Sequence, residues 1–192
     1  MDETPSQTAL RERLRAVGME LFRREGLRFT MQEAARAIHI SKKTIYAVYP
    51  SKEALLLDMV DDAFAQIHAR KQAILDGPGT LTDKLRAVII ALPEEYTALD
   101  LQQMDLLDEK YPRVAARVRQ HLETGWEPTL ALLQQAMEQG VIRTVSLPVL
   151  QRMISASIES FLADRTLEQQ GIPYAGALDE MMDILLDGLL IR

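Results

Sequence analysis

One segment near the N-terminus constrains the fold more than any other, because its residues suit two short helices joined by a tight turn. It covers residues 30–55 and reads TMQEAARAIHISKKTIYAVYPSKEAL. Thr30 and Glu33 have the Thr-x-x-Glu spacing of a reciprocal cap at a helix N-terminus, and Ser41 is placed to cap a second helix. Residues 38–40 form a connection too short to let the two helices separate. The segment therefore predicts a helix-turn-helix.

Two lysines, Lys42 and Lys43, fall in the first turn of the second helix of this motif. Cations at that position oppose the helix dipole by ~0.3–1 kcal/mol each, so a helix built only for stability would more often carry acids there. On their own, the lysines fit the solvated face of a small helical domain. Within a helix-turn-helix they instead suggest an anionic partner, namely the DNA backbone beside the major groove.

The whole segment resembles the DNA-binding motif of the TetR/AcrR family of bacterial transcriptional regulators, most of which are repressors. That motif runs approximately Thr…Ala…Gly-Val-Ser-x-x-x-Tyr-x-Tyr-Phe-x-x-Lys-x-x-Leu. The resemblance implies an all-α fold, with an N-terminal three-helix helix-turn-helix DNA-binding domain over residues 1–52. A C-terminal helical ligand-binding and dimerisation domain would follow over residues 53–192. The matching residues of this chain are Thr30, Ala34, Ser41, Tyr46, Lys52 and Leu55.

Three positions depart from the family pattern. His39 stands where the turn usually has Gly, and a histidine adopts positive φ at some cost. Val48 replaces a tyrosine that reaches a phosphate in the family, and Tyr49 replaces a phenylalanine. That phosphate contact is therefore either lost or passed to Tyr49.

The motif gives an expected set of DNA contacts. Lys42, Lys43 and Thr44 are expected to approach base edges, because the N-terminal part of a recognition helix enters the groove. There a lysine can donate to guanine, and a threonine can meet the methyl group of thymine. The main phosphate contacts are expected from Thr30, Lys42, Tyr46 and Lys52. The full expected set is Thr30, Ser41, Lys42, Lys43, Thr44, Tyr46, Tyr49 and Lys52.

The charge of the chain is divided between the two predicted domains. The whole chain has a net charge of −6, which as an average argues against binding nucleic acid. Residues 1–52 carry ten Lys or Arg against six Asp or Glu, a net charge of +4, whereas residues 53–192 carry twelve against twenty-two, a net charge of −10. The acidic remainder would therefore repel DNA and orient the molecule with its helix-turn-helix forward.

Composition excludes several other classes of function. The chain has 192 residues, 47% of them hydrophobic, and no cysteine, which excludes disulfides and cysteine catalysis. No apolar run approaches the ~20 residues of a membrane span, and the first residues lack a signal-peptide pattern, so we expect no membrane partner and a cytoplasmic protein. No phosphate-binding loop or nucleophile motif indicates an enzyme, and we expect no catalytic residue and no cofactor. His68 and His121 lack a local partner at metal-ligand spacing, so we expect no metal site.

Helical signals continue along the rest of the chain, and no segment has the alternation typical of a strand. The first helix should end at Gly26, and Ser51 should cap a long helix that reaches about residue 75. Residues 76–79 form the clearest break in the sequence. Further helices are expected from Thr80, from Pro93, over residues 112–140 with a kink or division near Pro128, over residues 147–170, and over residues 175–190.

The last two predicted helices have broad apolar stripes, which we assign to a homodimer interface. A single recognition helix reads few base pairs, so specific binding needs two half-sites read by a symmetric dimer. In the resembling family, the two C-terminal helices pair into a four-helix bundle. The alternative is that the same stripe is only intramolecular core. The expected interface residues are Met153, Ile154, Ser157, Ile158, Phe161, Leu178, Met181, Met182, Leu185 and Leu189.

The resemblance also implies a small-molecule effector that binds inside the C-terminal domain. Methionine and aromatic side chains suit an adaptable apolar pocket, so we expect a largely apolar ligand of unknown identity. The alternative is that these side chains simply fill the core. The candidate lining residues are Tyr96, Met104, Trp126, Met137 and Phe161.

Two other functions fit parts of the sequence. A helical protein-interaction scaffold would explain the acidic helices and the C-terminal apolar stripe, but not the positive N-terminal segment. A DNA-binding regulator controlled by a partner protein would keep the helix-turn-helix and dispense with the small ligand. Binding to duplex DNA that falls steeply as salt rises would favour a DNA-binding regulator over the scaffold.

Overall fold

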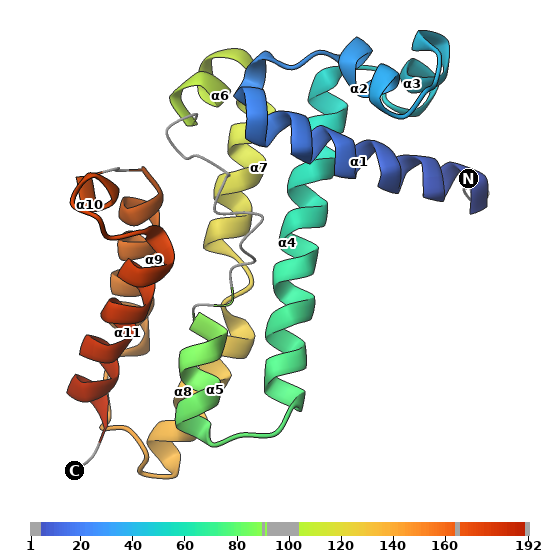
Figure 1. Cartoon of the computed structure of the whole chain (residues 1–192). Coiled ribbons are helices and arrows are strands. Elements are labelled where there is room, and N and C mark those ends of the chain that lie inside the picture. The colour runs from blue at the N-terminus through green and yellow to red at the C-terminus, as the bar shows by residue number, and fades with distance from the viewer. Residues whose placement is uncertain (1–4, 90, 92–103, 164–165, 191–192) are drawn as a thin grey trace. The chain divides into compact units, whose positions relative to one another are not determined.

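The computed structural model describes residues 5–89, 91, 104–163 and 166–190, and these residues form helices joined by short connections (Figure 1). The predicted all-α class is therefore confirmed. By packing, the chain divides into a first unit of residues 1–64 and 103–119 and a second unit of residues 65–102 and 120–192. This division does not fall at the predicted boundary of residue 52, because the long helix α4 (Lys52–Asp76) continues past it. The functional boundary stays a prediction.

The first unit contains the predicted helix-turn-helix. Its chain runs through α1 (Pro5–Glu25), a 3-10 turn η1 (Gly26–Arg28), α2 (Met31–Ala37) and α3 (Lys42–Val48) into the start of α4. The helix α6 (Met104–Lys110) and the first part of α7 (Pro112–Glu123) complete the unit. Its core is made of apolar side chains from these helices, including Leu14, Phe22, Phe29, Ile45 and Leu55.

The ends of the short helices are fixed by the capping residues that the sequence indicates. The Glu33 amide donates to Thr30 Oγ1 over 3.2 Å, and Glu33 Oε2 accepts from the Thr30 amide over 2.7 Å. The Ser41 hydroxyl accepts from the Thr44 amide over 3.0 Å. His39, in the turn between α2 and α3, has a φ of +58°, a conformation that few residues other than glycine adopt. The expected strain at this turn is therefore present.

The second unit contains the part of α4 from residue 65 onward and the end of α7 from residue 120 onward. Its other helices are α5 (Leu81–Ile89), α8 (Glu127–Glu138), α9 (Leu147–Ala163), α10 (Thr166–Gln169) and α11 (Tyr174–Leu189), and Figure 1 shows α9 and α11 side by side. Its core joins Leu85 and Val88 of α5 to Leu133 and Ala136 of α8 and to Ile154 of α9. Outside the helices of the described residues, Ile142 and Leu190 form a single antiparallel bridge.

The predicted helix boundaries agree with the structure in most places. The helix expected over residues 112–140 is divided near Gly125 into α7 and α8, as Pro128 indicates. The helix expected over residues 147–170 consists of two separate helices, α9 and α10. The helix expected from Pro93 lies outside the described residues.

Candidate nucleic-acid interface

The helix α3 is held to the core by one side and exposes the other. Ile45 is fully buried, whereas Lys42, Lys43, Tyr46 and Ala47 are exposed. We call these four residues the exposed α3 face. The Lys42 ammonium lies 5.9 Å from the centre of the Tyr46 ring, within the range of a cation–π contact. A short helix with one buried anchor and two cations on its open side can enter the groove of a duplex.

The hydroxyl groups of the predicted DNA-binding set are already engaged in the caps. Ser41 Oγ and Thr44 Oγ1 are 2.8 Å apart and share a hydrogen bond. Thr30 Oγ1 donates to Glu33 Oε2 over 2.8 Å, and these hydrogen bonds from Thr30 lower the pKa of the Glu33 carboxyl. Thr30 and one hydroxyl of the Ser41–Thr44 pair therefore use their donors internally, although each hydroxyl oxygen keeps acceptor capacity. The lysines of α3 are therefore the freer polar groups.

Tyr49, the C-cap of α3, is turned into the core instead of toward solvent. It is 2% exposed, and its hydroxyl donates to Asp58 on α4. The guanidinium carbon of Arg11 lies 5.2 Å from the centre of the Tyr49 ring. Burial and the hydrogen bond to Asp58 raise the pKa of Tyr49. The structure thus leaves Tyr49 little surface for the predicted phosphate contact.

Asp58 receives cations from α1 as well as the hydroxyl of Tyr49. Its carboxylate lies 3.5 Å from Arg15 Nη1 and 3.9 Å from Arg11 Nη1. Arg15 also reaches Asp62, one turn further along α4, over 3.2 Å. We call Tyr49, Asp58, Arg11 and Arg15 the Asp58 hub. It joins α1, the end of α3 and α4 through one carboxylate.

Lys52 is half-buried at the start of α4 and makes internal contacts. Its ammonium donates to the carbonyl oxygen of Leu27 over 2.7 Å and to that of Phe29. It also lies 4.1 Å from the centre of the Phe29 ring. Burial lowers its pKa. Two of its three donors are therefore used to fix the connection between α1 and α2, and one is left for a phosphate.

Ala47 is an exposed residue of α3 that is not in the predicted DNA-binding set. It is exposed and stands four residues after Lys43, so both lie on the same side of α3. This spacing could have been recognised, because a small apolar side chain beside a base-reading lysine suits the methyl group of thymine. Val48, the other departure from the family pattern, is half-buried.

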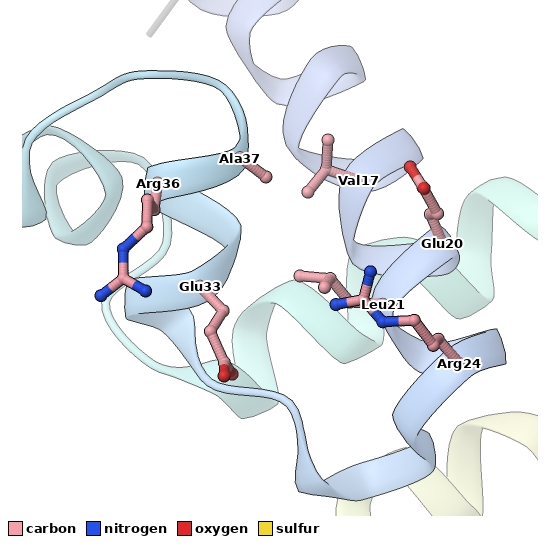
Figure 2. Close-up of a pocket in the computed structure, with 7 residues that line it drawn as sticks. All are labelled: Val17, Glu20, Leu21, Arg24, Glu33, Arg36 and Ala37. Atoms are coloured by element: carbon pink, nitrogen blue, oxygen red, sulfur yellow. The ribbon is translucent and has the colours of Figure 1, made fainter.

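A shallow groove of about 310 Å³ runs between α1 and α2 (Figure 2). Figure 2 shows its lining, in which Arg36 extends away from α1. The groove carries two glutamates and two arginines, so it has no net charge to attract an anion. Its residues are Val17, Glu20, Leu21, Arg24, Glu33, Arg36 and Ala37.

The residues predicted to line a ligand pocket are only partly described. Tyr96 and the side chain of Met104 lie outside the described residues. Trp126, Met137 and Phe161 are half-buried in the second unit, and Trp126 and Met137 pack against its core. Trp126 Nε1 donates to the carbonyl oxygen of Leu122 over 3.2 Å. These contacts fit the core interpretation, and a role in ligand binding stays a prediction.

The residues predicted for the dimer interface divide into three groups by their exposure. Ile154, Leu178, Met182 and Leu189 are buried within the second unit, so their side chains are used inside one protomer. Met153 is 54% exposed. The remaining five, Ser157, Ile158, Phe161, Met181 and Leu185, are half-buried.

The exposed apolar face of the second unit includes two residues outside the predicted set. Val149 on α9 is 57% exposed and Ile184 on α11 is 68% exposed. With Met153 and Leu185 they line a mainly apolar groove of about 430 Å³. Val149 could have been found from the sequence, because it precedes Met153 by four residues on the same helix face.

Two features of the described residues concern membrane insertion and metal binding. None of the helices there combines the length and apolar character of a membrane span. No group of three or more His, Asp or Glu side chains in the described part of the chain is arranged to hold a metal ion.

Comparison with known proteins finds a match to one family model in the N-terminal part of the chain. Residues 14–59 match the family described as bacterial regulatory proteins, tetR family. An uncharacterised HTH-type transcriptional regulator of Bacillus subtilis (strain 168), YvaF, is 26% identical over 182 residues, covering 93% of this chain and 94% of that protein.

Solved structures of similar fold cover nearly the whole chain. FadR from Thermus thermophilus, a TetR-family repressor in complex with lauroyl-CoA, is 28% identical, with 95% of this chain and 96% of that chain covered and a TM-score of 0.59. FadR from Bacillus subtilis, in complex with stearoyl-CoA, is 16% identical, with 94% and 99% covered and a TM-score of 0.72.

Proposed function

We propose that the chain, whose residues 14–59 match the TetR family of bacterial regulators and which resembles an HTH-type transcriptional regulator along most of its length, binds a palindromic operator as a homodimer and represses transcription. We further propose that a small, largely apolar effector binds in the second unit and releases the operator. Because its target is chromosomal DNA, the protein would act in the cytoplasm.

The exposed α3 face is the observation that carries this proposal. Lys43 is exposed and makes no hydrogen bond or ion pair within the part of the chain that the structure describes. Lys42 and Tyr46 lie beside it as a stacked pair. We assign base reading to Lys43 with Ala47, and phosphate contact to Lys42 and Tyr46, while the hydroxyl groups of Thr30, Ser41 and Thr44 would hold the helix ends.

Lys52 and Tyr49 take a different part in this proposal. Lys52 keeps one donor for a phosphate while its other contacts fix the segment before α2. Tyr49 orients α3 through its hydrogen bond to Asp58. Both would therefore position the exposed α3 face, and their direct contribution to DNA binding would be small.

A second copy of the chain is proposed to cover the apolar groove of the second unit. Val149, Met153 and Ile184 expose large apolar side chains on neighbouring helices, which is unusual for a surface that meets only water. Pairing α9 and α11 with their copies would make a four-helix bundle. Of the residues predicted from sequence, Met153, Met181 and Leu185 lie nearest to this role, and the buried ones would support it from beneath.

The effector is proposed to be a long-chain acyl-CoA or a similar amphiphile. Two proteins of the same fold are described in complexes with lauroyl-CoA and stearoyl-CoA. Trp126, Met137 and Phe161 are half-buried in the second unit, and side chains of these types can adapt to an apolar chain. This assignment narrows the largely apolar ligand expected from sequence to one with a charged head.

Selection of bound sequences from a random duplex pool tests the proposal most directly. We expect a palindromic consensus with half-sites about one helical turn apart, or a multiple of that. A consensus without symmetry would contradict the homodimer, and no enrichment would contradict DNA binding. Light scattering should give the mass of two chains at micromolar concentration.

Replacement of Lys43 tests the assigned base contact. Lys43→Ala should weaken binding to the selected operator by about 1–3 kcal/mol and relax the sequence preference at one position of each half-site. Arg70→Ala removes an equal charge from an exposed position of α4 and serves as the control. Equal losses in the two variants would show that Lys43 contributes only net charge.

A further inference from the structure

Lys71, a cation of the second unit, has no carboxylate partner among the residues that the structure describes. It projects from α4, is half-buried, and lies with its ammonium 5.5 Å from the centre of the Trp126 ring. This cation–π contact is its only polar interaction with the described residues. Burial lowers its pKa. A lysine that loses water without gaining a carboxylate is costly to keep charged, so its position calls for an explanation beyond packing.

His68 stands one turn before Lys71, and the chain between α7 and α8 closes directly against it. Gly125 has a φ of +76°, and a Cβ atom added there would lie 2.2 Å from His68 Cε1. Only glycine allows the backbone this close approach to the imidazole. Trp126 follows and is fixed by the hydrogen bond to Leu122. The ring of His68 and the indole of Trp126 are therefore held by the same connection that borders Lys71.

The electrostatic surroundings of this cluster are mainly basic. Burial first, and then the nearby Lys71 and His121, lower the pKa of His68, whereas Glu127 raises it. These groups come from α4, α7 and α8, the described helices that meet at this point. Lys71, His121 and Glu127 are thus close enough to His68 for their charges to act on its imidazole, and the basic groups outnumber the acid. Such an arrangement stabilises an anion that displaces the remaining water.

We propose that Lys71, His68 and His121, on the platform of Trp126, bind the anionic head group of the effector, which is a carboxylate or a phosphate. Lys71 supplies a charge-assisted hydrogen bond, and each imidazole can donate through a ring nitrogen. The inference rests on the proposed response to an amphiphilic effector. It adds to that response the class of group by which the effector is recognised.

Trp126 makes the inference directly measurable, because it is the single tryptophan of the chain and forms part of the cluster. Its fluorescence would be titrated in the intact dimer with lauroyl-CoA, coenzyme A alone, laurate and the uncharged dodecanol. The same titrations would be made on Lys71→Met, which keeps the apolar length of the side chain, and on Arg70→Met, a control at an exposed neighbouring position.

We expect Lys71→Met to raise the Kd of the probe that carries the recognised anion, which is lauroyl-CoA for a phosphate or laurate for a carboxylate, by about ten- to a hundredfold, the loss of a hydrogen bond from a charged group. The Kd of dodecanol should change less than twofold, and Arg70→Met should match the wild type. A weakening shared by coenzyme A identifies a phosphate, whereas one shared by laurate identifies a carboxylate. Equal Kd values for wild type and Lys71→Met with every anionic probe would overturn the inference.

Operator binding without ligand separates this inference from the proposed function. Lys71→Met should bind the selected operator as tightly as the wild type and should need more lauroyl-CoA or laurate for release. If neither protein binds any duplex while Lys71 still governs the fluorescence titration, the proposed repression fails and the anion site stands. If both proteins are released by the same concentrations of lauroyl-CoA and of laurate, the anion site fails and repression stands.

Discussion

Gly125→Ala should destabilise the protein through two effects, backbone strain and a steric clash, and the same substitution at Gly140 separates them. At a φ of +76°, an alanine pays the left-handed backbone strain of about 1–2 kcal/mol. Its Cβ would also lie 2.2 Å from His68 Cε1, so either the imidazole or the chain between α7 and α8 must move. Overpacking of this kind costs about 1–3 kcal/mol. The expected loss in the free energy of unfolding is therefore about 2–5 kcal/mol.

Gly140→Ala is the matched control. Gly140 has a φ of +67°, and no atom lies within 4 Å of the position that a Cβ would take. It should therefore show the backbone strain of about 1–2 kcal/mol and nothing more. Urea unfolding followed by circular dichroism gives the free energy of unfolding of each variant.

A double variant isolates the steric part. In a His68→Ala background, Gly125→Ala should cost only about as much as Gly140→Ala, because the clashing ring is gone, leaving a coupling of about 1–3 kcal/mol between positions 68 and 125. If Gly125→Ala and Gly140→Ala lower the free energy of unfolding equally, or if His68→Ala gives no relief, the close approach of the backbone to His68 is refuted.

Three further predictions concern the first unit. Tyr49→Phe should lower its stability by about 1.5–3 kcal/mol, because Asp58 loses a hydrogen bond, and thermal melts would detect this; no change in Tm would remove the hydroxyl from the Asp58 hub. Lys52→Met should lower the free energy of unfolding by a similar ~1.5–3 kcal/mol, because the ammonium loses its internal hydrogen bonds. The dependence of operator affinity on salt concentration should stay nearly unchanged, whereas a log–log slope smaller by about one would show that Lys52 contacts a phosphate. Hydrogen bonds from Thr30 lower the pKa of Glu33, so the contribution of Glu33 to the free energy of unfolding is complete above the ordinary glutamate pKa and is lost as pH falls. Glu33→Gln should therefore reduce the pH dependence of unfolding below about pH 5, and an unaltered profile would contradict this.

The helices could be predicted from the sequence because their ends are marked by local chemistry. Thr30 with Glu33, Ser41 and Pro128 act within one turn of the chain, and each has the role that its type and spacing indicate. The fate of Lys52 could not be predicted in this way. Its partners are carbonyl groups 25 and 23 residues earlier, and only the folded chain brings them together.

The apolar stripes of the last helices show the same limit. Periodicity indicates which side of a helix is apolar, but it cannot divide a broad stripe between a core and a partner. Ile154 and Met182 are inside the second unit, whereas Val149 and Ile184 are outside it. Likewise, His68 and His121 are far apart in the sequence, and only the packing of α4 and α7 lets one influence the pKa of the other.

The Asp58 hub couples the opening of the helices in the first unit. The carboxylate of Asp58 on α4 pairs with arginines of α1 and accepts a hydrogen bond from Tyr49 at the end of α3. Loss of these contacts would therefore loosen the packing of all three helices at once. The amide protons of α1 and α3 should then exchange with solvent together, in a single opening event. Operator binding and the folded state of the first three helices would therefore be lost at the same temperature.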